Sequence, residues 1–274
     1  MTAPLIDWRT RPVRSSREYL ALVEAAVAEY AERLWQRAAA ARLQWLRLVL
    51  RRVRRALERI PVEARTIQPE ERELARIIER INEQYAPPDL TGDLEALGEA
   101  IRLQYGFLPS DPRARILQRE FADLLRTDLG NYWRTLTDAR TLARKLTALR
   151  QEGQTTAQII RQVQQDYGSD YYSAERLVRT LYTAGANRAQ IEALADAGYT
   201  HKRWLTARDA RVRRARGKSK YDHVRMDGVE VPINEPFITP AGSRLMYPGD
   251  RSLGAAGGDI INCRCTIIGV VRRS

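Results

Sequence analysis

Apolar residues recur every three or four positions from Leu20 to Ile60, and this unbroken pattern restricts the fold more than any other feature of the sequence. Such spacing places all of them on one face of a single long helix. Ser15 and Ser16 precede the pattern and can cap a helix, whereas Pro61 follows it and cannot continue one. We therefore expect one helix to run from about residue 16 to residue 60.

The opposite face of this helix is rich in arginine, and few acidic residues balance the positive charge. The guanidinium groups could contact phosphates, or they could lie on the solvated side of a packed helix. The sequence favours neither interpretation over the other. The arginines on this face are Arg37, Arg42, Arg47, Arg51, Arg52, Arg54, Arg55 and Arg59.

Further helical segments follow, separated by proline and glycine breaks. We predict them at about residues 69–85, 92–105, 112–150, 157–167 and 171–197, with a bend near Gly130 in the longest. After Gly198 the pattern changes to short strand candidates, at about residues 199–205, 229–231, 237–238, 244–247 and 266–271. The expected fold class is therefore α+β, with an elongated, mainly helical N-terminal region and a small C-terminal α+β module of short strands. We divide the chain into an extended arm (1–15), a helical stalk or bundle (16–150) and the C-terminal module (151–274).

The chain is strongly basic, with a formal net charge of +12 at pH 7. Such a balance predicts attraction to a polyanion, which can be nucleic acid, an anionic membrane face or an acidic protein. No run of about 18 uncharged apolar residues is present, so we expect no membrane-spanning helix. The first residues lack the apolar core of a signal peptide, and two cysteines cannot build a disulfide framework. These features indicate a reducing compartment.

Positive charge is densest between His201 and Gly228, where ten basic residues stand against three aspartates. Gly217 and Ser219 lie inside this basic segment, and no apolar core needs so many like charges together. Contact with DNA phosphates is our favoured interpretation, and such contact would be independent of base sequence. An acidic surface on a partner protein is the second interpretation, and a merely solvated loop is the third. The ten residues are Lys202, Arg203, Arg208, Arg211, Arg213, Arg214, Arg216, Lys218, Lys220 and Arg225.

The two cysteines, Cys263 and Cys265, are separated by a single residue. Together with His223, and with His201 as a further possibility, they could bind zinc. The spacing is poor for a zinc knuckle, and buried cysteine is commonly an ordinary core residue. We therefore expect core thiols and no cofactor, with zinc as a less favoured alternative and a disulfide clip as a third.

An enzyme would use His223 with Asp209, Asp222 or Asp227 as a general base or as a nuclease metal cluster. However, Asp227-Gly228 between short strands is typical of a tight turn. No paired-carboxylate motif, nucleotide-binding glycine loop or nucleophile elbow is present. We therefore expect a protein that is not an enzyme.

Two further sequence features concern turns. In the stretch from Tyr247 to Asp250, Pro248 and Gly249 occupy the central positions of a predicted type II turn. The glycine-rich run from Gly254 to Gly258 is predicted to be flexible, and it contains no phosphate-loop lysine. Neither feature adds a catalytic group.

Taken together, several motifs in residues 153–268 resemble the phage head morphogenesis domain, found in the Mu F-like minor head protein family. Arg179-Thr180 and Asn187 match an R-T-E…N signature, although Leu181 replaces the acid. A basic insertion from Arg214 to Lys220 also departs from the family pattern. The other matching residues are Trp204, Asp209, His223, Asp227, Gly228, Phe237, Pro248, Gly249, Asn262, Cys263 and Cys265.

The resemblance implies a minor structural protein of a tailed-phage or prophage head, acting in head morphogenesis and capsid assembly. It implies portal and capsid proteins as partners, with packaged phage DNA as a non-specific contact. The expected location is the virion, inside or near the head–portal vertex, and the host cytoplasm during assembly. The alternative is a nuclease or effector enzyme that carries a Mu F-like domain.

Overall fold

The computed structural model describes residues 14–59, 67–86, 88–167, 171–217 and 219–271. The contacts group the chain into two compact units, each built from separate stretches. Unit 1 contains residues 1–32, 91–127 and 175–274, and unit 2 contains residues 33–90 and 128–174. The boundaries predicted at residues 15 and 150 stay predictions, because the units combine distant stretches. Most of the predicted arm, Lys218 and the break at residues 168–170 lie outside the described residues.

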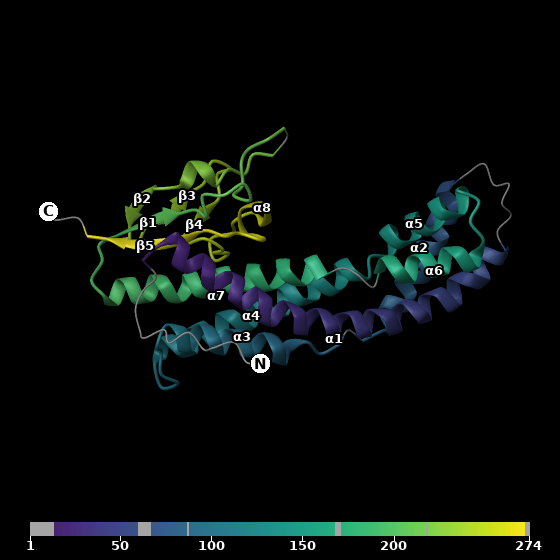
Figure 1. Ribbon diagram of the computed structural model, residues 1–274, viewed down its shortest axis with the longest axis horizontal. Coiled ribbons are helices and arrows are strands. Elements are labelled where there is room, and N and C mark those ends of the chain that lie inside the picture. The colour runs from purple at the N-terminus through teal and green to yellow at the C-terminus, as the bar shows by residue number, and fades with distance from the viewer. Residues whose placement is uncertain (1–13, 60–66, 87, 168–170, 218, 272–274) are drawn as a thin grey trace. The chain divides into compact units, whose positions relative to one another are not determined.

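The fold class predicted from the sequence is confirmed, with long helices first and short antiparallel strands near the C-terminus (Figure 1). The predicted first helix is present as α1, and Ser15 Oγ caps it by accepting a hydrogen bond from the Glu18 amide at 3.1 Å. The helices are α1 (Ser16–Arg59), α2 (Ile67–Gln84), α3 (Thr91–Gln104), α4 (Pro112–Leu136), α5 (Ala139–Gln151), α6 (Thr156–Tyr167) and α7 (Tyr171–Asp196). No described helix is both apolar enough and long enough to span a bilayer.

The bend predicted near Gly130 does not interrupt the helix. Helix α4 continues through Gly130 to Leu136, and the chain breaks only before α5. The cause is a local cap, because the Asp138 side chain accepts a hydrogen bond from the Thr141 amide at 2.6 Å and starts the next helix. A glycine inside a helix weakens it without ending it.

Unit 2 is held together by hydrogen bonds that link its helices across their packed faces. Trp45 donates its indole N–H to Asn82, whose amide donates to the Thr137 carbonyl at 2.9 Å. Arg42, which we had placed on the exposed arginine face of α1, is buried and donates to the Leu136 carbonyl at 3.0 Å. That placement was wrong for Arg42, since its guanidinium satisfies the carbonyl end of α4.

The small sheets of unit 1 come from the last third of the chain. Strand β1 (His201–Leu205) lies between β2 (Glu230–Pro232) and β5 (Thr266–Val270), antiparallel to both. A second pair is formed by β3 (Phe237–Ile238) and β4 (Arg244–Leu245). Two short helices complete the module: the 3₁₀ helix η1 (Val224–Met226) and α8 (Gly257–Ile260). The prediction of a flexible run from residue 254 missed α8.

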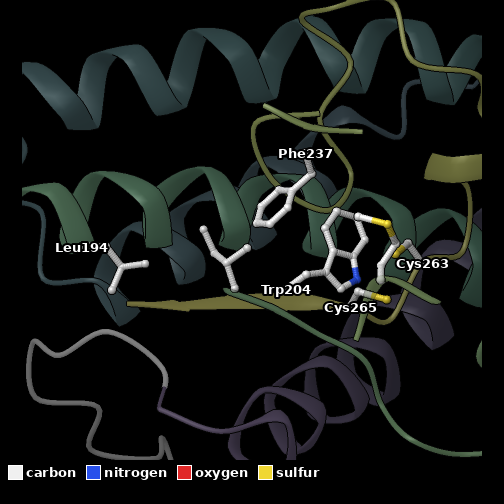
Figure 2. Close-up of a cluster of buried hydrophobic side chains, with 7 residues drawn as sticks. Leu194, Trp204, Phe237, Cys263 and Cys265 are labelled. Carbon is white, nitrogen blue, oxygen red and sulfur yellow. The ribbon is translucent and has the colours of Figure 1, made fainter. Parts of the chain in front are cut away.

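A compact apolar core lies beneath the three-stranded sheet (Figure 2). The Trp204 indole occupies its centre, between the Phe237 ring and the two cysteines, and it meets the Phe237 ring edge-on at 5.2 Å. Helix α7 contributes Leu194 to the same core, so the sheet packs on this helix instead of standing alone. The core residues are Leu194, Trp204, Met226, Phe237, Cys263, Cys265 and Ile267.

The predicted turn at Pro248-Gly249 is confirmed. The Asp250 amide donates to the Tyr247 carbonyl at 3.1 Å, and Gly249 has a φ of +90°. A Cβ at Gly249 would lie 3.0 Å from the backbone of Ala184 in α7. The turn therefore needs glycine both for its backbone conformation and for its close contact with the helix.

Candidate functional site

The basic segment lies mainly in the connection between β1 and η1, and three of its arginines have acidic partners. Arg203 donates to Glu230 at 2.7 Å, and Arg208 donates to Asp227 at 2.9 Å. Arg211 lies 3.5 Å from Glu24 of α1. The side chains of Arg208 and Arg211 remain 69% and 62% exposed, so they can still reach an external anion.

Lys202 was wrongly included among the candidate contacts, because its side chain is fully buried. Successive residues of a strand point to opposite faces, so Lys202 shares the inward face of β1 with Trp204. Its ammonium donates to the Ile233 carbonyl at 2.9 Å and lies 5.4 Å from the centre of the Phe237 ring. Burial lowers the pKa of Lys202 to about 8.

Arg213 is half-buried and makes several contacts within the protein. Its guanidinium donates to the Ile261 carbonyl, and its backbone carbonyl accepts hydrogen bonds from the amides of His223 and Val224 at 3.0 and 3.2 Å. Arg213 therefore fixes the course of the chain where it enters η1. Because part of its guanidinium is already occupied by the Ile261 carbonyl, Arg213 is a weaker candidate for an external anion than the exposed arginines beside it.

Four basic residues of the segment are exposed and have no acidic partner among the described residues. The carboxylate of neighbouring Asp222 accepts from the Arg225 backbone amide at 3.3 Å and leaves the guanidinium to solvent. No apolar contact explains four exposed cations within residues 214–225, so this exposed cation set is the best candidate surface for an anionic partner. The four residues are Arg214, Arg216, Lys220 and Arg225.

The family-motif residues of α7, in contrast, face inward and bind the chain around the cysteines. Arg179 donates to the Asn262 side chain at 2.9 Å, and the Asn262 amide donates to the Thr180 hydroxyl at 2.8 Å. Asn262 adopts a φ of +59°, a conformation that asparagine tolerates better than most residues. Leu181, which replaces the acid of the family signature, is fully buried.

Asn187 has the largest set of hydrogen bonds in this region. Its amide nitrogen lies 3.1 Å from the Pro248 carbonyl and 3.0 Å from the Cys265 carbonyl, and its oxygen accepts from the Thr266 hydroxyl at 2.8 Å. Tyr19 of α1 lies 3.3 Å from the same nitrogen. One buried side chain therefore joins α7 to the Pro248-Gly249 turn and to β5.

A group that the sequence did not reveal is Glu24 of α1. Its carboxylate lies within 3.6 Å of the guanidinium groups of Arg179, Arg211 and Arg264. Asp209 shares Arg264, whose Nη1 donates to it at 2.5 Å. Nothing in the sequence pattern distinguishes Glu24 from other acids on the polar side of α1, so no sequence signal could have found it.

The two cysteines and His223 come together at the edge of the core. Cys263 Sγ and Cys265 Sγ lie 3.5 and 3.6 Å from His223 Nδ1. On the other side of the ring, His223 Nε2 donates to Asp259 Oδ1 at 3.2 Å, and Asp259 Oδ2 accepts from the Thr239 hydroxyl at 2.9 Å. All of these side chains are buried. His201 lies at the start of β1 outside this cluster and contacts the Thr200 hydroxyl instead.

The electrostatic environment shifts the pKa values of the two thiols in opposite directions. The hydrogen bond from Cys265 and the nearby His223 ring lower the pKa of Cys263, whereas burial raises the pKa of Cys265. Burial lowers the pKa of His223, but Cys263 and the Asp259 hydrogen bond outweigh it and raise the pKa to about 9. Burial raises the pKa of Asp259, but its hydrogen bonds with His223, Ser243 and Thr239 together outweigh burial and lower the pKa.

The acids that the sequence offered as partners of His223 bind elsewhere. Asp209 pairs with Arg264, Asp222 accepts from the Arg225 amide, and Asp227 accepts from the Thr206 amide at 2.8 Å. The predicted pairing was wrong, and the carboxylate that contacts His223 is Asp259 on the unpredicted helix α8.

A nucleophilic cysteine needs open access for its substrate. The Cys263 side chain is only 2% exposed, so its thiol lacks such access in this structure.

Comparison with protein-family models, with curated proteins and with solved structures finds no match for this chain.

Proposed function

We propose that the protein is a minor head protein of a tailed phage or prophage, acting in head morphogenesis near the portal and contacting DNA non-specifically. The support is the resemblance of residues 153–268 together with the way those motifs are used. Motif residues from α7, from β1 and from the segment before β5 contribute to one buried network. Because these residues contact one another in the fold, a protein with this fold is expected to have all of them together. This expectation adds weight to a resemblance that rests on several short motifs.

The observation that carries the proposed DNA contact is the exposed cation set: Arg214, Arg216, Lys220 and Arg225. Arg214, Arg216 and Lys220 lie in the connection before η1, and Arg225 lies in η1 itself. The Arg213 carbonyl accepts from the amides of His223 and Val224, which ties the start of this stretch to its end. Arginine matches phosphate geometry, and such contacts need no base recognition. A rigid core with a cationic connection suits attachment to DNA of any sequence. The proposed role is non-enzymatic.

The DNA contact can be tested with paired charge reversals in the full-length chain. Four phosphate contacts would give a slope of log K against log salt of about −3.6, and loss of two would reduce it to about −1.8. We therefore expect Arg214→Glu/Arg216→Glu to weaken binding to duplex DNA and to flatten its salt dependence. The matched control is Arg115→Glu/Arg119→Glu, which makes the same change in net charge at exposed positions of α4 in the same unit.

Equal binding and equal slopes for the two double variants would overturn the DNA contact at this segment. Binding to acidic head proteins but not to DNA, lost in the first variant only, would favour the acidic-partner interpretation. The head role is tested separately by mass spectrometry of purified particles. We expect the chain at low abundance relative to the capsid protein, and its absence from particles would refute the proposed role.

A further inference from the structure

We propose that His223, Cys263 and Cys265 form a zinc site that fastens η1 to the chain entering β5. These residues offer one imidazole nitrogen and two thiol sulfurs, and the three atoms lie within 4.8 Å of one another. Nitrogen and thiolate sulfur are the donors that zinc prefers in proteins. The proposal goes beyond the DNA-binding and head-assembly role and does not depend on it.

The distances fit an ion in the middle of the three donors. With Zn–S bonds of about 2.3 Å and a Zn–N bond of about 2.0 Å, tetrahedral geometry places sulfur and nitrogen about 3.5 Å apart. The two sulfur–nitrogen separations are 3.5 and 3.6 Å. Both thiols approach the same nitrogen from the short stretch that precedes β5, in which a single residue separates Cys263 from Cys265.

Hydrogen bonding alone accounts poorly for this arrangement. While Nε2 donates to Asp259, Nδ1 offers a single lone pair in the neutral ring or a single N–H in the protonated ring, so it can make one good hydrogen bond in either state. Two sulfurs nevertheless lie at nearly equal distances from that nitrogen. A zinc ion would bind all three donors at once.

The surroundings also match those of a zinc-binding histidine. Such a histidine usually donates its other ring nitrogen to a carboxylate, which fixes the ring orientation and raises its basicity. Asp259 provides that carboxylate, and Thr239 in turn donates to Asp259. The Trp204 ring meets the His223 ring edge-on at 5.5 Å and closes the site on another side.

Three protein donors leave one position of a tetrahedral ion to a water molecule or a small anion. The chain has no cysteine beyond these two, and its other histidine, His201, lies elsewhere. The enclosed position favours a structural role: the ion would join segments about forty residues apart in a module whose sheets are small.

The test is metal analysis of the reduced, full-length protein, followed by zinc titration of chelator-treated protein. We expect about one zinc per chain and, with cobalt, the intense visible absorption of a tetrahedral thiolate site. Asp259→Asn should retain binding but weaken it about 10- to 100-fold, as loss of an outer-sphere carboxylate does elsewhere. His223→Ala should lose stoichiometric zinc, whereas His201→Ala, the control, should keep it.

The His223→Ala variant could fail to fold, so the titration of wild-type protein decides the matter independently. Zinc-free, folded wild-type protein that takes up no zinc would overturn the proposal. So would a Cys263–Cys265 disulfide in place of bound metal, or equal zinc affinity in wild-type and Asp259→Asn proteins. Protection of both thiols from alkylation by added zinc would support it.

Discussion

The buried ammonium of Lys202 predicts that this one side chain destabilises the protein less as the pH rises from 7 to 9.5. Burial lowers the pKa of Lys202 from 10.5 to about 8, so at pH 7 the native state holds a charge that the unfolded chain keeps in water at lower cost. The difference between these two pKa values corresponds to a free energy of about 3 kcal/mol that the charged side chain costs the native state. Between pH 7 and pH 9.5 the native side chain loses its proton while the unfolded one mostly keeps it, which restores about 2 kcal/mol.

The substitution Lys202→Met removes the titrating group from this position while keeping a long side chain. Its cost at any one pH includes the lost hydrogen bond to Ile233, but only the lysine contributes the pH-dependent part. We therefore expect the stability of wild type relative to the variant to rise by about 2 kcal/mol from pH 7 to pH 9.5. Urea unfolding of both proteins at each pH, followed by tryptophan fluorescence, measures this difference.

The control is Lys220→Met, which removes the same charge from an exposed position of the basic segment. A wild-type advantage over Lys202→Met that stays constant across this pH range would refute the reasoning. It would mean that the ammonium is solvated in the native state or stabilised there by nearby acids.

Two other predictions follow from the packing of α7 against the strands and turns that come after it in the chain. Asn187→Leu should lower the free energy of unfolding by about 2–4 kcal/mol, because it leaves buried carbonyls unpaired. Urea unfolding measures this loss, with Asn234→Ala at an exposed position as the control. Equal losses in the two variants would contradict the prediction. Gly249→Ala should destabilise by about 2 kcal/mol more than Gly254→Ala, because both have positive φ but only the first meets the Ala184 backbone at 3.0 Å. Thermal unfolding compares the two, and equal melting temperatures would show that the turn can move away from the helix.

The sequence predicted the helices and strands well because their signals are local. The spacing of apolar residues located α1, and the Pro248-Gly249 pair located its turn. It failed where a single side chain overrode a weak local signal, as when Asp138 started a helix and Gly130 did not end one. The glycine-rich stretch before Asp259 hid α8, because glycine disfavours a helix by itself.

The candidate site was harder to predict because it depends on contacts between distant residues. Charge alone placed Lys202 and Arg213 in the same group as Arg214, although Lys202 is buried and the Arg213 guanidinium donates to the Ile261 carbonyl. Period-two alternation along β1 could have revealed Lys202, since Trp204 is its inward neighbour. No comparable signal links Glu24 to the arginines that surround it, because that contact exists only in the folded chain.

The discontinuous composition of unit 1 has a consequence for biosynthesis. The start of α1 uses Tyr19 and Glu24 to contact residues much later in the sequence, such as Asn187 and Arg264. During translation, this part of the helix remains without these partners until the ribosome has also made residues 187–264. A fragment that starts at residue 153 would therefore lack residues that cover part of its core. We expect expression of the isolated module to need residues 16–32 and 91–127 supplied with it.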